Sequence, residues 1–306
     1  MESLKESINK LRKEKDALIL AHNYQLGEIQ DIADFTGDSL ELSFKAAQCK
    51  KELIVFCGVT FMAETASILA NDKIVLLPVL EAGCPMADMA DVGKLRKLKA
   101  EHPNAIVVTY VNSSAEVKAE SDICVTSANA IKIISSLPLD REIIFVPDQN
   151  LGNYCSKKTG RKIILWNGFC PTHMRISPEY IIKRKEEFPD AKVIVHPECP
   201  IDVIALADEV LSTGGMIKYA KTTDAKKIIV ATELGLIYRL EKENPEKQFI
   251  PVSEQAVCPN MKLTRLEDVL DALKNLKYPV KVPSEIAKKA RVPIEKMLEM
   301  SSTQNK

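Results

Sequence analysis

The 306-residue chain lacks an excess of charge of either sign, because 42 lysines and arginines are balanced by 42 aspartates and glutamates. Proteins that bind nucleic acid normally carry a basic patch or surplus, so we expect no nucleic-acid partner. No apolar run approaches the ~20 residues that cross a bilayer, so we expect no membrane partner. The N-terminal stretch MESLKESINKLRKEKD is charged and lacks the apolar core of a signal peptide.

These absences set the interpretation of the eight cysteines. Without a secretion signal we expect a cytoplasmic location, where thiols are kept reduced. In such a compartment a cysteine is more often a metal ligand, a catalytic group or a small buried side chain than half of a disulfide. Histidine is also scarce, with four in the whole chain, so the position of each one carries information.

A Cys-Pro dipeptide recurs at Cys84, Cys170 and Cys258, at intervals of 86 and 88 residues. Each copy follows an apolar run that we expect to be a strand, at residues 74–77, 163–165 and 249–252. A repeat of this length indicates one supersecondary unit used three times, with a thiol at the same place in each. We therefore expect the three thiols to meet at one metal centre.

The units themselves alternate strands and helices in the order β-α-β-α-β. This pattern is typical of parallel sheets covered by helices, so the predicted fold class is α/β, with three αβα three-layer units about a pseudo-threefold axis. The predicted units span residues 1–91, 92–176 and 177–306, and the third includes the C-terminal helices. We expect the last of these helices, which begins near Pro283, to be interrupted at Pro293.

Polar residues recur in register at the ends of predicted strands and the starts of predicted helices. The first strand of each unit ends at a ring-bearing residue, and a second polar residue follows two positions later: His22 and Tyr24, Tyr110 and Asn112, His196 and Glu198. Seventeen residues after the first set come three hydroxyls, Ser39, Ser127 and Thr213. Ligands of parallel α/β units bind beyond the carboxyl ends of the strands. The three units are thus expected to share one polar central cavity.

The residues alone leave alternatives open. Three cysteines fit zinc, although a structural zinc site would want a fourth protein ligand. They equally fit a 4Fe-4S cluster that leaves one iron open to substrate. The hydroxyls are suited to capping helices, at about 1 kcal/mol each, or to binding an anion together with free helix N–H groups. His173 also falls at a predicted strand end, and Glu198 is placed to act as a general base.

The motifs that contain these positions are highly specific when taken together. They are AHNYQ (21–25), TGDSLELS (36–43), GCPMADM (83–89), TYVNSSAEVKA (109–119), VTSANA (125–130), FVPDQNLG (145–152), WNGFCPTH (166–173), VHPECP (195–200), STGGM (212–216), ATELGLIYRL (231–240) and CPNMKLT (258–264). In these segments the chain resembles the quinolinate synthases, iron–sulfur enzymes of de novo NAD biosynthesis. The resemblance runs from residue 21 to residue 264.

The resemblance implies one 4Fe-4S cluster per chain, held by Cys84, Cys170 and Cys258. It implies condensation of iminoaspartate with dihydroxyacetone phosphate to quinolinate, with release of phosphate and water, the iminoaspartate being supplied by an aspartate-oxidising enzyme. The catalytic residues would be Tyr24, Glu198, His22 and His196. Substrate would contact His22, Ser39, Tyr110, Val111, Asn112, Ser127, His173, His196, Pro197, Glu198 and Thr213. Rival interpretations are an iron–sulfur hydratase acting on a dicarboxylate, and a structural zinc or electron-transfer protein.

Overall fold

Three parallel four-stranded sheets form the framework of the protein, in a computed structural model that describes residues 3–302. The first sheet contains β1 (Ala17–His22), β2 (Phe35–Gly37), β3 (Leu53–Cys57) and β4 (Ile74–Leu76). The second contains β5 (Ile106–Tyr110), β6 (Ile123–Val125), β7 (Ile143–Val146) and β8 (Ile163–Leu165). The third contains β9 (Lys192–Val195), β10 (Glu209–Val210), β11 (Lys227–Ala231) and β12 (Gln248–Pro251).

The strand order is the same in every sheet: β2-β1-β3-β4, β6-β5-β7-β8 and β10-β9-β11-β12. This confirms the predicted α/β class and the threefold internal repeat. It also adds one strand per unit, because β2, β6 and β10 were not predicted. These strands have only two or three residues, too few for an alternating pattern to be recognised in a sequence.

Five helical segments accompany each sheet at equivalent places. They are α1 (Leu4–Glu14), α2 (Gly27–Ile32), α3 (Ser39–Ala47), α4 (Thr60–Leu69) and α5 (Pro85–Asp88) in the first unit. The second has α6 (Val92–Glu101), α7 (Ala115–Ala119), α8 (Ala130–Ser136), α9 (Gln149–Thr159) and α10 (Pro171–Met174). The third has α11 (Pro178–Glu187), α12 (Ile201–Ile204), α13 (Thr213–Thr222), α14 (Gly235–Glu243) and the 3₁₀ turn η1 (Asn260–Lys262).

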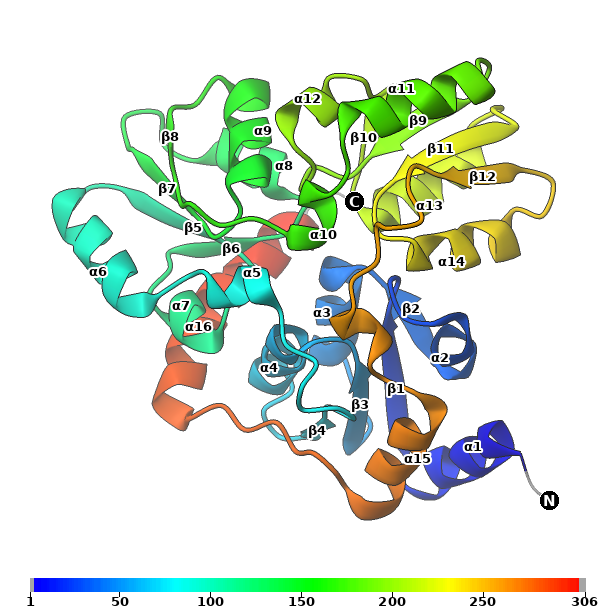
Figure 1. Cartoon of the computed structure of the whole chain (residues 1–306). Coiled ribbons are helices and arrows are strands. Elements are labelled where there is room, and N and C mark those ends of the chain that lie inside the picture. Colours follow the sequence, from blue (N-terminus) through cyan, green and yellow to red (C-terminus); the bar gives the residue numbers. More distant parts are fainter. Residues whose placement is uncertain (1–2, 303–306) are drawn as a thin grey trace.

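Short strands can hold these sheets together because they are covered on both faces. Every residue of β3 and β5 is buried, as expected of parallel strands between two helical layers. Figure 1 shows the three sheets around a common centre, toward which α5 and α10 project. The strand pairing explains the 17-residue register. His22 pairs with Gly37 and Tyr110 with Val125, so the end of each first strand lies beside the start of the next long helix.

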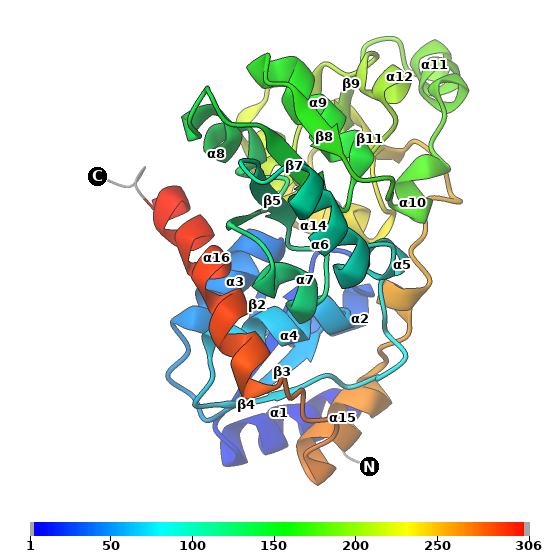
Figure 2. The ribbon, with the colours of Figure 1, turned by 90° about the vertical axis from the view of Figure 1, so that its left-hand side faces the viewer.

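The C-terminal helices α15 (Leu266–Asn275) and α16 (Ser284–Ser302) do not extend the third unit. α15 packs on α1 and β3, and α16 lies along α7, β6 and α4, beside the first two units. Figure 2 shows α16 beside α7 and α4. The division of the chain at residues 91 and 176 stays a prediction.

The expected interruption at Pro293 was wrong, because α16 continues through it. The carbonyl four residues earlier belongs to Lys289, which is exposed and can bind water instead of an amide.

Within residues 3–302, no helix is both long enough and apolar enough to cross a membrane.

Candidate active site

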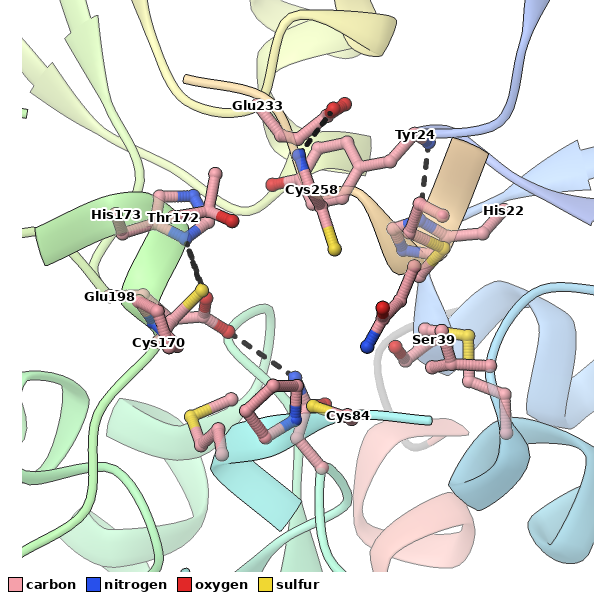
Figure 3. A pocket seen from close by; sticks show the side chains of 18 of the residues that line it. His22, Tyr24, Ser39, Cys84, Cys170, Thr172, His173, Glu198, Glu233 and Cys258 are labelled. Carbon is pink, nitrogen blue, oxygen red and sulfur yellow. Dashed lines mark hydrogen bonds and ion pairs between the residues drawn. The ribbon is translucent and has the colours of Figure 1, made fainter. Parts of the chain in front are cut away.

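A central cavity of about 210 Å³ lies where the carboxyl ends of the three sheets converge. Residues of all three units line it, and Figure 3 shows their side chains pointing inward. It includes nearly every predicted site residue: His22, Tyr24, Ser39, Cys84, Tyr110, Asn112, Ser127, Cys170, His173, His196, Glu198, Thr213 and Cys258. Two predicted residues are not in its wall. Val111 lines a smaller adjoining pocket with Ser39, and Pro197 is buried beside the cavity.

The three repeated cysteines occupy equivalent turns. Cys84 and Cys170 directly precede the short helices α5 and α10, and Cys258 precedes η1. Proline follows each cysteine and begins the turn, at a position whose N–H would have no partner within the helix. Amides further along the turn then face the sulfur, those of Met86 and Ala87 for Cys84, His173 for Cys170, and Asn260 and Met261 for Cys258. Each turn therefore brings at least one backbone N–H near the sulfur atom.

All three thiols are free, and burial raises their pKa, to about 12 for Cys84. The other cysteines lie outside the lining of the cavity: Cys49, Cys57, Cys124, Cys155 and Cys199. In the part of the chain that is described, the ligand atoms of Cys170, His173 and Glu198 lie within 4.8 Å of one another. Those three atoms are close enough for one metal ion, although His173 Nδ1 already lies 3.1 Å from Cys170 Sγ and 2.8 Å from Glu198.

Glu198 is the acceptor at the centre of this network. Its carboxylate accepts a hydrogen bond from Tyr110 Oη at 2.6 Å and faces His173 Nδ1 at 2.8 Å, with Asn112 Nδ2 at 3.4 Å. Burial by itself would raise the pKa of Glu198, but the neighbouring His173 and the Tyr110 hydroxyl hold it well below its usual value. Glu198 is thus a buried carboxylate that stays ionised, surrounded by groups that can carry a proton.

A second arm of the network leads to Tyr24. His173 Nε2 lies 2.9 Å from Thr232 Oγ1, and Thr232 Oγ1 lies 2.5 Å from Tyr24 Oη. Burial and the charge of Glu198 raise the pKa of Tyr24 well above its ordinary value, so the phenol keeps its proton. Glu198 and Tyr24 are thereby connected through His173 and Thr232, by the 2.8 Å contact of His173 Nδ1 with Glu198 and by two hydrogen bonds. The sequence analysis did not identify Thr232 as a functional residue. The only signal for it was its place in the motif ATELGLIYRL (231–240).

Comparison with known proteins agrees with this arrangement. The family model described as "Quinolinate synthetase A protein" matches residues 6–299. A quinolinate synthase of Dehalococcoides mccartyi (strain CBDB1) is 60% identical over 297 residues, which cover 97% of this chain and 98% of that protein. Quinolinate synthases of Geotalea uraniireducens (strain Rf4) and Thermodesulfovibrio yellowstonii (strain ATCC 51303 / DSM 11347 / YP87) are 56% and 53% identical, each over 97% of this chain and 97% and 98% of their own lengths.

The chain belongs to the quinolinate synthase family. The proteins of this family to which it is similar are enzymes of NAD biosynthesis, so the chain is an enzyme. The family resemblance in the sequence is confirmed over nearly the full length. The roles of the individual residues stay predictions, and the geometry of this family member indicates how each side chain is prepared for its role.

The two strand-end histidines share one geometry. Nδ1 of His22 accepts the amide N–H of Tyr24 at 3.2 Å, and Nδ1 of His196 accepts that of Glu198 at 3.3 Å. Burial lowers the pKa of both rings to about 3, so both are neutral at pH 7. A neutral ring that accepts at Nδ1 carries its proton on Nε2. Both histidines can therefore donate to a substrate oxygen, which is a binding role more than a basic one.

The three hydroxyls do not cap helices, so that interpretation was wrong. α3 is capped by Asp38 and α13 by Ser212, each one residue before the hydroxyl in question, and α8 begins at Ala130, after Asn129. Some of the amides at these helix starts are already bonded within the chain, whereas anion binding by the others stays a prediction. Asp38 Oδ1 accepts the N–H groups of Leu40 and Glu41 at the start of α3, and Ser212 Oγ accepts that of Gly215 in α13. The three residues themselves line the cavity.

Two buried carboxylates behind the cysteines were missed by the sequence reading. Glu233 accepts the amide N–H of Cys258 at 3.0 Å and pairs with Lys262 Nζ at 2.9 Å. Asp148 Oδ1 accepts the amide N–H of Leu151 at 2.8 Å, and its other oxygen, Oδ2, is buried without a hydrogen bond among the described residues. Both carboxylates follow the third strand of their sheet in chain order. A carboxylate at the same place in two repeats was the available sign, but no sequence rule predicts what it contacts.

Proposed function

We propose that this protein is a quinolinate synthase that condenses iminoaspartate with dihydroxyacetone phosphate to quinolinate, releasing phosphate and water. We further propose that it acts in the cytoplasm, that an aspartate-oxidising enzyme supplies the iminoaspartate, and that Cys84, Cys170 and Cys258 hold a 4Fe-4S cluster. The observation that carries the proposal is the convergence of three equivalent cysteine turns on one cavity that also contains the Glu198 network (Figure 3).

The donor set fits a cluster better than a single ion. Thiolates are the ligands that iron–sulfur clusters take. Sulfur atoms around one zinc ion lie about 3.8 Å apart, given Zn–S bonds of ~2.3 Å in a tetrahedron. Among the described residues, the three thiols do not form a group with all sulfurs within 4.8 Å of one another. N–H groups that face each sulfur also support an anionic, metal-bound thiolate.

When bound, such a cluster supplies an open iron that acts as a Lewis acid toward a substrate carboxylate, hydroxyl or imine. The chain's own residues supply the proton transfers that condensation and dehydration need. Ionised Glu198 is the base, and Tyr24, which keeps its proton, is the acid. Thr232 and His173 connect the two, so a proton taken at one side of the cavity can be returned at the other.

Binding of the substrates is assigned to groups that can donate hydrogen bonds. Both substrates are anionic, one through two carboxylates and the other through a phosphate. The neutral rings of His22 and His196 present Nε2–H groups, and Asn112 presents an amide. The hydroxyls of Ser39, Ser127 and Thr213 complete the donor set from three sides. A cavity that excludes water strengthens each of these contacts.

The test is anaerobic purification, cluster reconstitution and assay of quinolinate. Wild-type protein should contain about four irons per chain and convert both substrates. Cys84→Ser, Cys170→Ser and Cys258→Ser should each lose the brown absorbance, whereas Cys49→Ser, the matched control outside the cavity, should retain it. A cluster retained in Cys170→Ser would overturn the ligand assignment. Product formed without consumption of dihydroxyacetone phosphate would overturn the reaction.

A further inference from the structure

Asn23 is a fully buried amide held between two units. It directly follows β1, and its Nδ2 lies 2.9 Å from Thr213 Oγ1 at the start of α13. Its Oδ1 lies 2.7 Å from Nη1 of Arg239, on α14. Arg239 is fixed in turn, because Nη1 also donates to the carbonyl of Thr36 at 2.7 Å and Nε donates to Glu243 at 2.6 Å.

This order of contacts fixes the direction of both hydrogen bonds in the series from Arg239 through Asn23 to Thr213. A guanidinium can only donate, so the atom of Asn23 that faces Arg239 must be the carbonyl oxygen. The NH₂ group must then face Thr213 and donate to it. Thr213 Oγ1 is therefore an acceptor toward Asn23, and its own O–H proton has to point elsewhere.

The cavity is the open space next to Thr213 toward which that proton can turn. Thr213 is 3% exposed and lines the cavity. Within the described residues, its hydroxyl has no bond other than the one from Asn23. The amide N–H of Gly215, in the same turn of α13, is already bound by Ser212 Oγ at 3.1 Å. In the described part of the chain, the Thr213 hydroxyl is thus a donor at the start of α13 for which no acceptor is present.

We propose that Arg239 and Asn23 are positioning residues that hold the Thr213 hydroxyl as an obligate donor, so that it binds an oxyanion of the substrate. Neither residue touches the cavity, and both act through Thr213. Phosphate and carboxylate share this chemistry, and the identity of the two candidate ligands rests on the proposed function. A substrate group that must itself donate a hydrogen bond is disfavoured at this position.

Asn23→Asp is the sharpest test, since it keeps the shape of the side chain and reverses the direction of its hydrogen bond with Thr213 Oγ1. A carboxylate can only accept, so the Thr213 proton would turn toward residue 23 and a lone pair would face the ligand. The new ion pair with Arg239 should preserve the fold. We expect the holoenzyme to lose about ten-fold or more in affinity for one of two probes, dihydroxyacetone phosphate or quinolinate, the size of one charge-assisted hydrogen bond. Loss for the first identifies a phosphate, and loss for the second a carboxylate.

Further variants separate the effect of hydrogen-bond direction from the effect of altered side-chain packing. Thr213→Val should lose the same probe to a similar extent, and the double variant should lose no more than either single variant. Arg239→Met, which leaves Asn23 free to flip, should lose less than Asn23→Asp. Asn104→Asp, at an exposed site, controls for the added charge and should bind both probes normally.

Titration calorimetry of the cluster-loaded proteins, with thermal unfolding to confirm the fold, measures these effects. Unchanged affinity for both probes in folded Asn23→Asp would overturn the inference, as would additive losses in the double variant. Should Asn23→Asp not fold, an Arg239→Met protein with wild-type affinities would overturn it equally. Wild-type protein that binds neither probe would overturn the proposed function and the inference with it.

Discussion

Replacement of Glu198 by glutamine is the most direct test of the proposed chemistry. Glutamine keeps the length of the side chain and one oxygen for Tyr110 Oη, now 2.6 Å away. Its NH₂ group would replace the carboxylate oxygen that now lies 2.8 Å from His173 Nδ1, and an amide nitrogen cannot accept a proton there. The link from the base through His173 to Tyr24 is therefore broken at its first step, although the cavity keeps its shape.

The expected loss can be estimated from the two parts of the change. Removing a positioned general base typically costs 10²–10⁴-fold in rate, or about 3–5 kcal/mol of barrier. Hydrogen bonds to a charged group contribute roughly 1.5–3 kcal/mol to stability, but the variant also avoids the cost of burying a carboxylate. These stability effects oppose each other. We therefore expect a large loss of turnover with little change in the unfolding temperature.

The assay is quinolinate formation under anaerobic conditions by variants matched for iron content. Glu209→Gln, at an exposed glutamate of the same unit, is the control and should be fully active. A Glu198→Gln enzyme with wild-type iron content and turnover within about three-fold of wild type would refute the assignment of Glu198 as base, because the loss would fall far below that of a removed general base.

Three further outcomes are expected. Glu233→Gln should lose cluster iron faster in air than wild type. The substitution removes the ion pair with Lys262 from the side chain that accepts the Cys258 amide N–H. Iron per chain over time measures this loss. Asp31→Asn should be less stable by about 1 kcal/mol at pH 7. The hydrogen bond from Lys242 lowers the pKa of Asp31 to about 2, so its stabilisation is present above pH ~4 and is lost as the pH falls toward 2; a pH series of denaturant melts checks that the two proteins converge. Ile294→Ala, at a fully buried position of α16, should cost about 2–5 kcal/mol in urea unfolding; a cost near zero would refute the structural role of this helix.

The repeat in the sequence predicted much of the architecture, since strand and helix patterns depend on neighbouring residues. Parallel pairing then fixes which residues lie together inside a unit, as the pairing of His22 with Gly37 beside Ser39 illustrates. Very short strands and the exact N-caps were missed. A two-residue strand such as β10 carries no pattern, and Ser39 and its neighbour Asp38 are both good caps by residue type.

By itself, the sequence determined the α/β class, the three units, the three cysteines and the strand ends that carry the polar residues. Only the tertiary structure decided what those residues touch. His173 and Thr232 are 59 positions apart, and Asn23 and Thr213 are 190 apart, so their contacts arise from the packing of whole units against one another. The same packing buries Glu198 among donors that hold its pKa low, and gives the Thr213 hydroxyl its direction. Spacing along a chain reports local geometry, whereas charge state and hydrogen-bond direction depend on every group that surrounds a side chain in space.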